Sequence, residues 1–137
     1  MRLRILSCAL WVLVMAACVF GQEAPPPGPW VRTDVSGYAN GCTLPRSGKE
    51  HSTPQRAANG KWPLPGVSVA ASKDIPFGTI LELRYEHHSY LMLVEDRGPD
   101  ITRGRLDIFF ATCADASTWG RKWLDVRVRR LPIGGDK

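Results

Sequence analysis

The sequence lacks features that define several large classes of protein. It has only four cysteines, too few for a small scaffold held together by disulfides. Its one long apolar run, residues 5–20, is shorter than a membrane-spanning helix usually needs. The sequence has no internal repeat and no cysteine and histidine spacing typical of a zinc site. At 137 residues the chain is also too short for a multidomain enzyme, so we expect one small domain.

The first 21 residues have the composition of an export signal. They contain seventeen hydrophobic residues, two arginines near the start and no acidic residue. Val19-Phe20-Gly21 before Gln22 suits cleavage by signal peptidase. Met15-Ala16-Ala17-Cys18 instead resembles a lipobox, in which a lipidated Cys18 would tether the protein to a membrane. Both alternatives predict an exported protein of the periplasm, the outer membrane or the extracellular space.

The remaining 116 residues have the composition of an ordinary soluble domain. Their net charge is +3 rather than +5, because two arginines belong to the predicted signal, and they keep two of the four cysteines. Four prolines within residues 22–29 predict an extended spacer over residues 22–31. Residues 32–132 are then left for a single domain, and residues 133–137 for a flexible tail.

The domain is predicted to be mainly β. Apolar runs and alternating segments predict strands over residues 31–38, 67–71, 79–85, 90–94, 106–110 and 123–130. Residues 86–89 are expected at a hairpin tip, and residues 41–65 in a long, functional surface loop. Thr112 as a cap and Gly120 as a terminator predict a short helix over Cys113–Trp119. Six strands with one short helix before the last predict a small closed barrel.

Two aspartates in the most informative stretch, residues 94–110, suggest acid–base chemistry. Asp96 ends one predicted strand, and Asp107 lies eleven residues later inside an otherwise apolar strand. If barrel strands bring the two together, one carboxyl would keep its proton toward neutral pH and act as a general acid. The alternative is structural: Asp-Arg-Gly-Pro is an ordinary turn, and Asp107 is the solvent-facing member of an alternating strand.

The motifs around these aspartates resemble two related families. Asp96-Arg97-Gly98-Pro99, followed by Gly104-Arg105 and Asp107, resembles the signature of rare lipoprotein A-like proteins. Residues 105–110 and 116–128 are more similar to the three-aspartate (3D) domain, which also forms the C-terminal part of membrane-bound lytic transglycosylase A. Both families are double-psi β-barrels, so the resemblance implies a six-stranded double-psi β-barrel over nearly the whole mature chain.

The resemblance implies lytic cleavage of the glycan strands of peptidoglycan, a reaction that needs no cofactor or metal. It implies that Asp107 is the general acid and base and that Asp96 is its electrostatic partner. We expect Arg97 and Arg105 of the same signature to contact the substrate. Trp62, in the long loop, is expected either to pack within that loop or to stack on a sugar ring.

Two positions depart from the family patterns and keep a second function open. Ser72 stands where rare lipoprotein A-like enzymes have a histidine, and Ala71 lies near the position of the earliest aspartate of the 3D family. Asp74, three residues later, is the candidate to replace that aspartate. The alternative function is that of an expansin-like module, which binds peptidoglycan without cleaving it.

Other polar and aromatic residues have simpler interpretations. Cys42 and Cys113 are expected to form a disulfide, with two free thiols as the alternative. His87 and His88 are adjacent, so they are expected to lie in solvent at the hairpin tip rather than to bind a metal. Trp119 and Trp123 are expected in the core. The basic second half favours an anionic cell-wall polymer or membrane surface rather than nucleic acid, since the protein is predicted to be exported, with a solvated face as the alternative.

Overall fold

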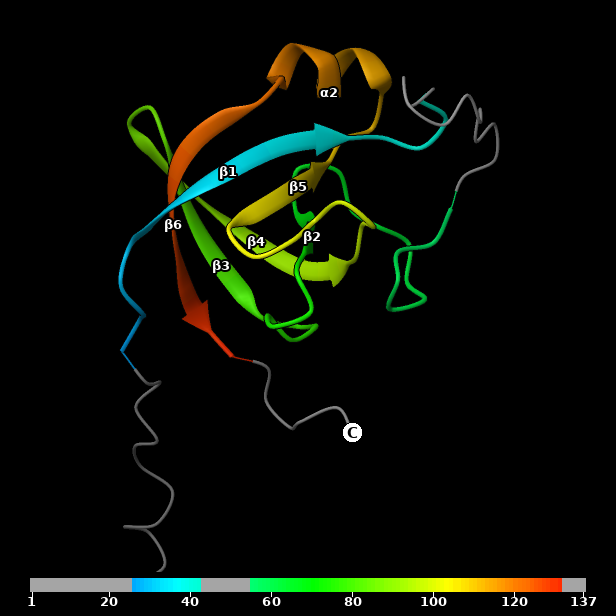
Figure 1. Cartoon of the computed structure of the whole chain (residues 1–137). Helices are drawn as coiled ribbons and strands as arrows, with labels where there is room; N and C mark the ends of the chain where they lie inside the picture. Colours follow the sequence, from blue (N-terminus) through cyan, green and yellow to red (C-terminus); the bar gives the residue numbers. More distant parts are fainter. Residues whose placement is uncertain (1–25, 43–54, 132–137) are drawn as a thin grey trace, which may run out of the picture.

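Six strands and one helix follow one another in the order that the sequence predicts. The computed structural model in Figure 1 describes residues 26–42 and 55–131. Its elements are β1 (Val31–Tyr38), β2 (Ser68–Ala71), β3 (Ile80–Tyr85), β4 (His88–Asp96), β5 (Arg105–Phe109), α2 (Cys113–Trp119) and β6 (Lys122–Arg130). The strands close into one barrel in the order β1-β5-β2-β4-β3-β6. The predicted six-stranded double-psi β-barrel is therefore confirmed, with its helix directly before the last strand.

Several predictions fall on residues outside the described ranges. These are the signal peptide over residues 1–21, the lipidation of Cys18, the start of the spacer at residues 22–25 and the tail over residues 133–137. Residues 43–54 of the long loop, which include His51, are also outside. All of these stay predictions. In the part of the chain that is described, no helix is long and apolar enough to cross a membrane.

Two parallel strand pairs give the barrel its connectivity. β1 pairs in parallel with β5, and β2 in parallel with β4. The other neighbours, β1 with β6, β2 with β5, β3 with β4 and β3 with β6, are antiparallel. Parallel neighbours need long crossover connections, so strands distant in sequence become neighbours in space. As a result, β2 lies between β4 and β5, the two strands that carry the candidate aspartates (Figure 1).

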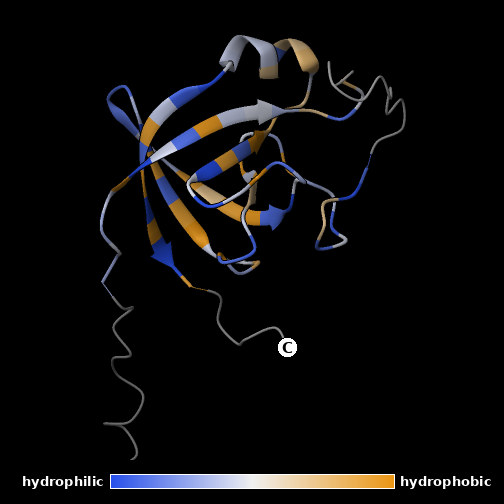
Figure 2. Cartoon of the chain, viewed as in Figure 1, coloured by the Kyte–Doolittle hydropathy of each residue, from blue (hydrophilic) through white to orange (hydrophobic). Residues whose placement is uncertain are grey.

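The core is built from alternate residues of the strands. Hydrophobic and hydrophilic positions alternate along them in Figure 2, as expected where one face of a strand is buried. On β3 and β6, Leu83 and Val126 point inward. The buried cluster comprises Val35, Val69, Ala71, Leu81, Leu83, Met92, Val94, Leu106, Ile108, Leu124 and Val126. Polar side chains at the alternating positions are consequently turned to the outside.

The helix has the ends that the sequence predicts. The Thr112 hydroxyl accepts a hydrogen bond from the Asp115 N–H at 3.1 Å and donates one to the Asp115 carboxylate at 2.7 Å. At the other end, the Gly120 N–H donates to the Ala116 carbonyl at 3.0 Å. Cys113, the first residue of α2, forms a disulfide with Cys42, which lies beyond the end of β1.

Three details differ from the sequence-based expectations. The hairpin tip contains only Glu86 and His87, because His88 already pairs with Tyr85 across the two strands. Trp123 was expected in the core but is 58% exposed, since the inward position on β6 belongs to its neighbour Leu124. The end of the predicted spacer also contacts the barrel. Its Gly28 N–H donates to the Val128 carbonyl at 2.8 Å.

The inward and outward positions of the β3–β4 hairpin predict different sensitivities to truncation. Leu83 is 1% exposed and Leu91 is 58% exposed. Replacing Leu83 with alanine should lower the free energy of unfolding by about 2–5 kcal/mol, because it removes buried contacts and leaves a cavity. Leu91→Ala is the matched control and should change it by less than about 0.5 kcal/mol. Urea unfolding followed by tryptophan fluorescence measures both, and equal losses would contradict the assigned faces.

Candidate functional site

A row of four residues crosses the outside of the barrel. Across the strands, Ser36 on β1 pairs with Asp107 on β5, Asp107 with Ala70 on β2, and Ala70 with Asp96 on β4. Directly paired residues present their side chains to the same face of a sheet. An irregularity in the register between Val69 and Ala70 sets the position of Asp96 in this row. Thus the two predicted aspartates lie on one face of the sheet. One strand, β2, runs between them, and it presents only the small side chain of Ala70 there.

The carboxyl of Asp107 is largely buried. The Ser36 hydroxyl donates a hydrogen bond to its Oδ1 at 3.1 Å. Burial, which disfavours the charged form, raises the pKa of Asp107 to about 6. Ser36 and the Arg105 guanidinium lower this pKa, and the nearby Asp96 raises it further. From the sequence, the second carboxylate alone was expected to raise this pKa, whereas burial is the larger cause.

The carboxylate of Asp96 is held by three hydrogen-bond donors. The Tyr38 hydroxyl donates to Oδ2 at 2.5 Å, and the backbone N–H groups of Ala58 and Arg97 each donate to Oδ1 at 2.8 Å. Burial and the bond to Asp96 raise the pKa of Tyr38 above its ordinary value, so this phenol stays protonated and remains a donor. Asp96 and Asp107 therefore have contrasting surroundings, the condition under which two carboxyls divide acid and base roles.

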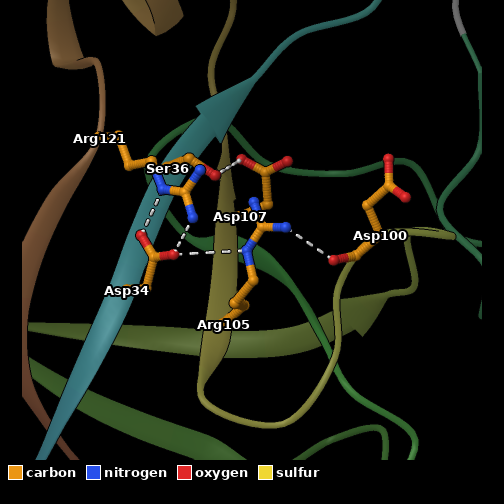
Figure 3. A network of polar contacts seen from close by, with 6 residues as sticks. All are labelled: Asp34, Ser36, Asp100, Arg105, Asp107 and Arg121. Carbon is orange, nitrogen blue, oxygen red and sulfur yellow. Dashed lines mark hydrogen bonds and ion pairs between the residues drawn. The ribbon is translucent and has the colours of Figure 1, made fainter. Parts of the chain in front are cut away.

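An ion-pair cluster that the sequence did not predict lies beside Asp107. Asp34 on β1 is only 4% exposed, and it accepts a hydrogen bond from Arg121 Nε at 2.7 Å. Arg105 Nε lies 3.5 Å from the other oxygen of Asp34, and Arg105 Nη1 donates to the Asp100 carbonyl at 2.9 Å (Figure 3). The bond from Arg121 lowers the pKa of Asp34. The only sign of this cluster in the sequence was a charged residue, Asp34, within the first predicted strand.

Arg97, predicted to contact the substrate, binds backbone carbonyls in this structure. Its guanidinium donates to the carbonyls of Asp96, Ala71 and Ile75 at 3.0, 3.4 and 2.7 Å. It also lies over the Phe77 ring, 4.0 Å from the ring centroid. Arg97 thereby connects the end of β4 to the turn after β2, and its contact with substrate stays a prediction.

Asp74, the third predicted carboxylate, has different partners from the other two. It accepts a hydrogen bond from the Ser72 hydroxyl and lies 3.3 Å from Arg103 Nε, and the bond from Ser72 lowers its pKa. With Ser72 and Arg103 it lines a largely apolar pocket of about 280 Å³ to which neither Asp96 nor Asp107 contributes. The structure thus brings two of the three predicted carboxylates together and places the third in other surroundings.

Trp62 lies in the loop that contacts Asp96. Its side chain is 53% exposed, and the Arg56 guanidinium lies 4.6 Å from its ring centroid. Ala58, which donates to Asp96, belongs to the same loop.

Within residues 26–42 and 55–131, no three histidine, cysteine, aspartate or glutamate side chains are grouped as a metal site would require.

Comparison with known families gives a match over the strands that carry the aspartates. Residues 67–130 match the family model of the 3D domain. The barrel is a 3D-like double-psi domain. This match starts just before β2 and ends with the last residue of β6, so it includes Asp96 and Asp107. Ser36, Tyr38 and Asp34, which contact these aspartates or their neighbours, lie on β1 before the matched segment.

Among solved structures, this chain is similar to part of MltA from Escherichia coli. One crystal structure of MltA shares 25% identity over 58% of this chain, with a TM-score of 0.46. A second, described as revealing a unique lytic transglycosylase fold, shares 24% identity over 61% of this chain, with a TM-score of 0.48. A third contains bound chitohexaose and shares 20% identity over 60% of this chain, with a TM-score of 0.48. The chain spans 29–30% of these structures, and a search of curated proteins found no match.

The raised pKa of Asp107 predicts a pH-dependent contribution to stability. The pKa is about 6 in the folded protein and about 3.8 without the fold, so folding favours the protonated form. This contribution is fully present below about pH 4 and is lost as the pH rises through about 6. Relative to the parent protein, Asp107→Asn should therefore gain on the order of 1–3 kcal/mol between pH 4 and pH 8.

Urea unfolding at a series of pH values measures this difference. Asp100→Asn, at an exposed carboxyl in the connection between β4 and β5, is the matched control and should not show this gain. Curves for the parent and Asp107→Asn that run parallel from pH 4 to pH 8 would contradict the assigned environment of Asp107.

Proposed function

We propose that this protein cleaves the glycan strands of peptidoglycan by lytic transglycosylation, with Asp107 as general acid and base. The observation that carries the proposal is the pairing of Asp107 and Asp96 on either side of Ala70, on one face of a 3D domain. A carboxyl whose pKa is near 6 is suited to donate a proton close to neutral pH and to accept one back.

The proposed reaction uses one proton in a closed cycle. Asp107 protonates the glycosidic oxygen as the bond from that oxygen to the muramic acid C1 breaks. The ionised Asp107 then removes the proton of the C6 hydroxyl of the same sugar while O6 bonds to C1. An anhydro ring forms without water, and Asp107 regains its proton. The Ser36 hydroxyl, 3.1 Å from Asp107, is placed to steady the carboxylate between the two steps.

Asp96 supports this cycle by its fixed negative charge. Three donors hold its carboxylate on the face that it shares with Asp107. Positive charge develops on the sugar ring as the glycosidic bond breaks, and a fixed carboxylate stabilises that charge. The exposed ring of Trp62, in the loop bound to Asp96, offers an apolar face for a neighbouring sugar. Export through the signal of residues 1–21, with or without a lipid on Cys18, would bring the protein to this substrate.

The second candidate is an expansin-like module that binds the same strands without cleaving them. The observation in its favour is the separation of Asp74, whose partners are Ser72 and Arg103 rather than the paired aspartates. If the reaction requires a third carboxylate at the site, only binding would remain. Enzyme and binding module share one surface, so product analysis is needed to distinguish them.

Incubation of the purified chain with sacculi tests the proposal. Mass analysis should find soluble fragments ending in anhydro-muramic acid. Asp107→Asn should reduce their release at least about 100-fold, because it removes the acid and base, while sedimentation with sacculi should persist. Asp100→Asn is the matched control and should cleave like the parent. Reducing ends would indicate hydrolysis, and sedimentation without release would favour the binding module.

A further inference from the structure

Asp34 is a buried carboxylate for which the proposed reaction has no use. Two guanidinium groups converge on it, Arg121 through Nε at 2.7 Å and Arg105 through Nε at 3.5 Å. The two arginines come from different elements, since Arg105 begins β5 and Arg121 directly precedes β6. Asp34 thus gathers both cations on the β1 side of the candidate site, as Figure 3 shows.

Arg105 is close enough to pair with Asp107 if Asp34 did not hold it. Residues i and i+2 of a strand point to the same face about 6.5–7 Å apart, a distance that an extended arginine side chain spans. In the structure its Nη1 is instead bound to the Asp100 carbonyl at 2.9 Å. The guanidinium of Arg105 therefore forms an ion pair with Asp34 and one hydrogen bond to the Asp100 carbonyl, rather than pairing with the neighbouring Asp107.

The charged and titratable groups around Asp107 come from β1, β4 and β5 itself. β1 contributes Tyr38 and Asp34, β4 contributes Asp96, and β5 itself contributes Arg105. β2 presents only Ala70. Arg105 is the cation that already acts on the charge of Asp107, and Arg121 is fixed on Asp34 beside it.

We propose that Asp34 is a positioning residue of the acid–base site, which holds Arg105 in an ion-pair cluster beside Arg121 and so prevents Arg105 from pairing with Asp107. An arginine in direct contact with a carboxylate stabilises its ionised form and lowers its pKa by about 1–3 units. A general acid paired in this way would be ionised at neutral pH and have no proton to donate. The expected effect of Asp34 on the catalytic rate rests on the proposed function. Its expected effect on the pKa of Asp107 does not.

The test is a titration of the Asp107 side-chain carboxyl by carbon-13 NMR in the full chain. In Asp34→Asn, Arg105 is released, and the apparent pKa of Asp107 should fall by about 1–3 units. Adding Arg105→Gln to Asp34→Asn removes the released cation and should return the pKa to the parent value or above. A merely structural role for Asp34 would not be corrected by this second substitution. An unchanged pKa in Asp34→Asn, or no recovery in the double variant, would overturn the proposal.

Two further variants control for folding. Asp125→Asn breaks the exposed ion pair between Asp125 on β6 and Arg32 on β1. It should leave the Asp107 titration unchanged. If Asp34→Asn does not fold, Asp34→Asn with Arg121→Gln removes one charge of each sign and still frees Arg105. Its Asp107 pKa should also fall, and an unchanged value in that folded variant would contradict the proposal.

Activity provides an independent readout. If the parent cleaves sacculi, the alkaline limb of the rate profile in Asp34→Asn should move to lower pH by the same number of units as the NMR pKa. The alkaline limb should return to its position in the parent when Arg105→Gln is added to Asp34→Asn. If the parent does not cleave sacculi, the proposed function fails, while the titration still decides whether Asp34 controls Asp107.

Discussion

The pairing of β2 with both β4 and β5 is the constraint on which the site depends. Ala70 is hydrogen-bonded into the sheet between the two strands, so the distance from Asp96 to Asp107 is set by backbone geometry rather than by side-chain attraction. Two carboxylates repel each other, and only a framework fixed independently of them keeps both on one face. The buried neighbours Val69 and Ala71, packed inward on the same strand, supply that framework.

Within this framework, the partners of each carboxyl determine its chemistry. Asp107 is largely buried and accepts a hydrogen bond from Ser36, and burial dominates, so its pKa rises to about 6. Asp96 receives three donors, and Asp34 receives two guanidinium groups. A small barrel has little interior in which to hide charge. Differences between its carboxyls must therefore come from the donors that the surrounding strands and loops supply.

Most of the fold and the central pair of the site were predictable from the sequence. Strand and helix positions followed from alternation and from the caps at Thr112 and Gly120, and Asp96 and Asp107 followed from their motif. Residues that depend on tertiary pairing were not predictable. Trp123 is exposed because Leu124 takes the inward position, which alternation alone leaves open when both residues are apolar. Arg97 belongs to the motif, but its binding to backbone carbonyls depends on how the turn after β2 folds back.

Asp34 shows why the site extends beyond the motif that reveals it. It lies 73 positions before Asp107 and outside the matched 3D segment, yet parallel pairing sets Asp34 against Arg105 and Ser36 against Asp107. The strand that supplies Ser36 as a donor to the acid therefore also supplies the carboxylate that binds the competing arginine. Tyr38, two residues further along β1, fixes Asp96. Three alternate residues of β1 thus act on three different groups, so β1 is as much a part of the site as the strands that bear the paired aspartates.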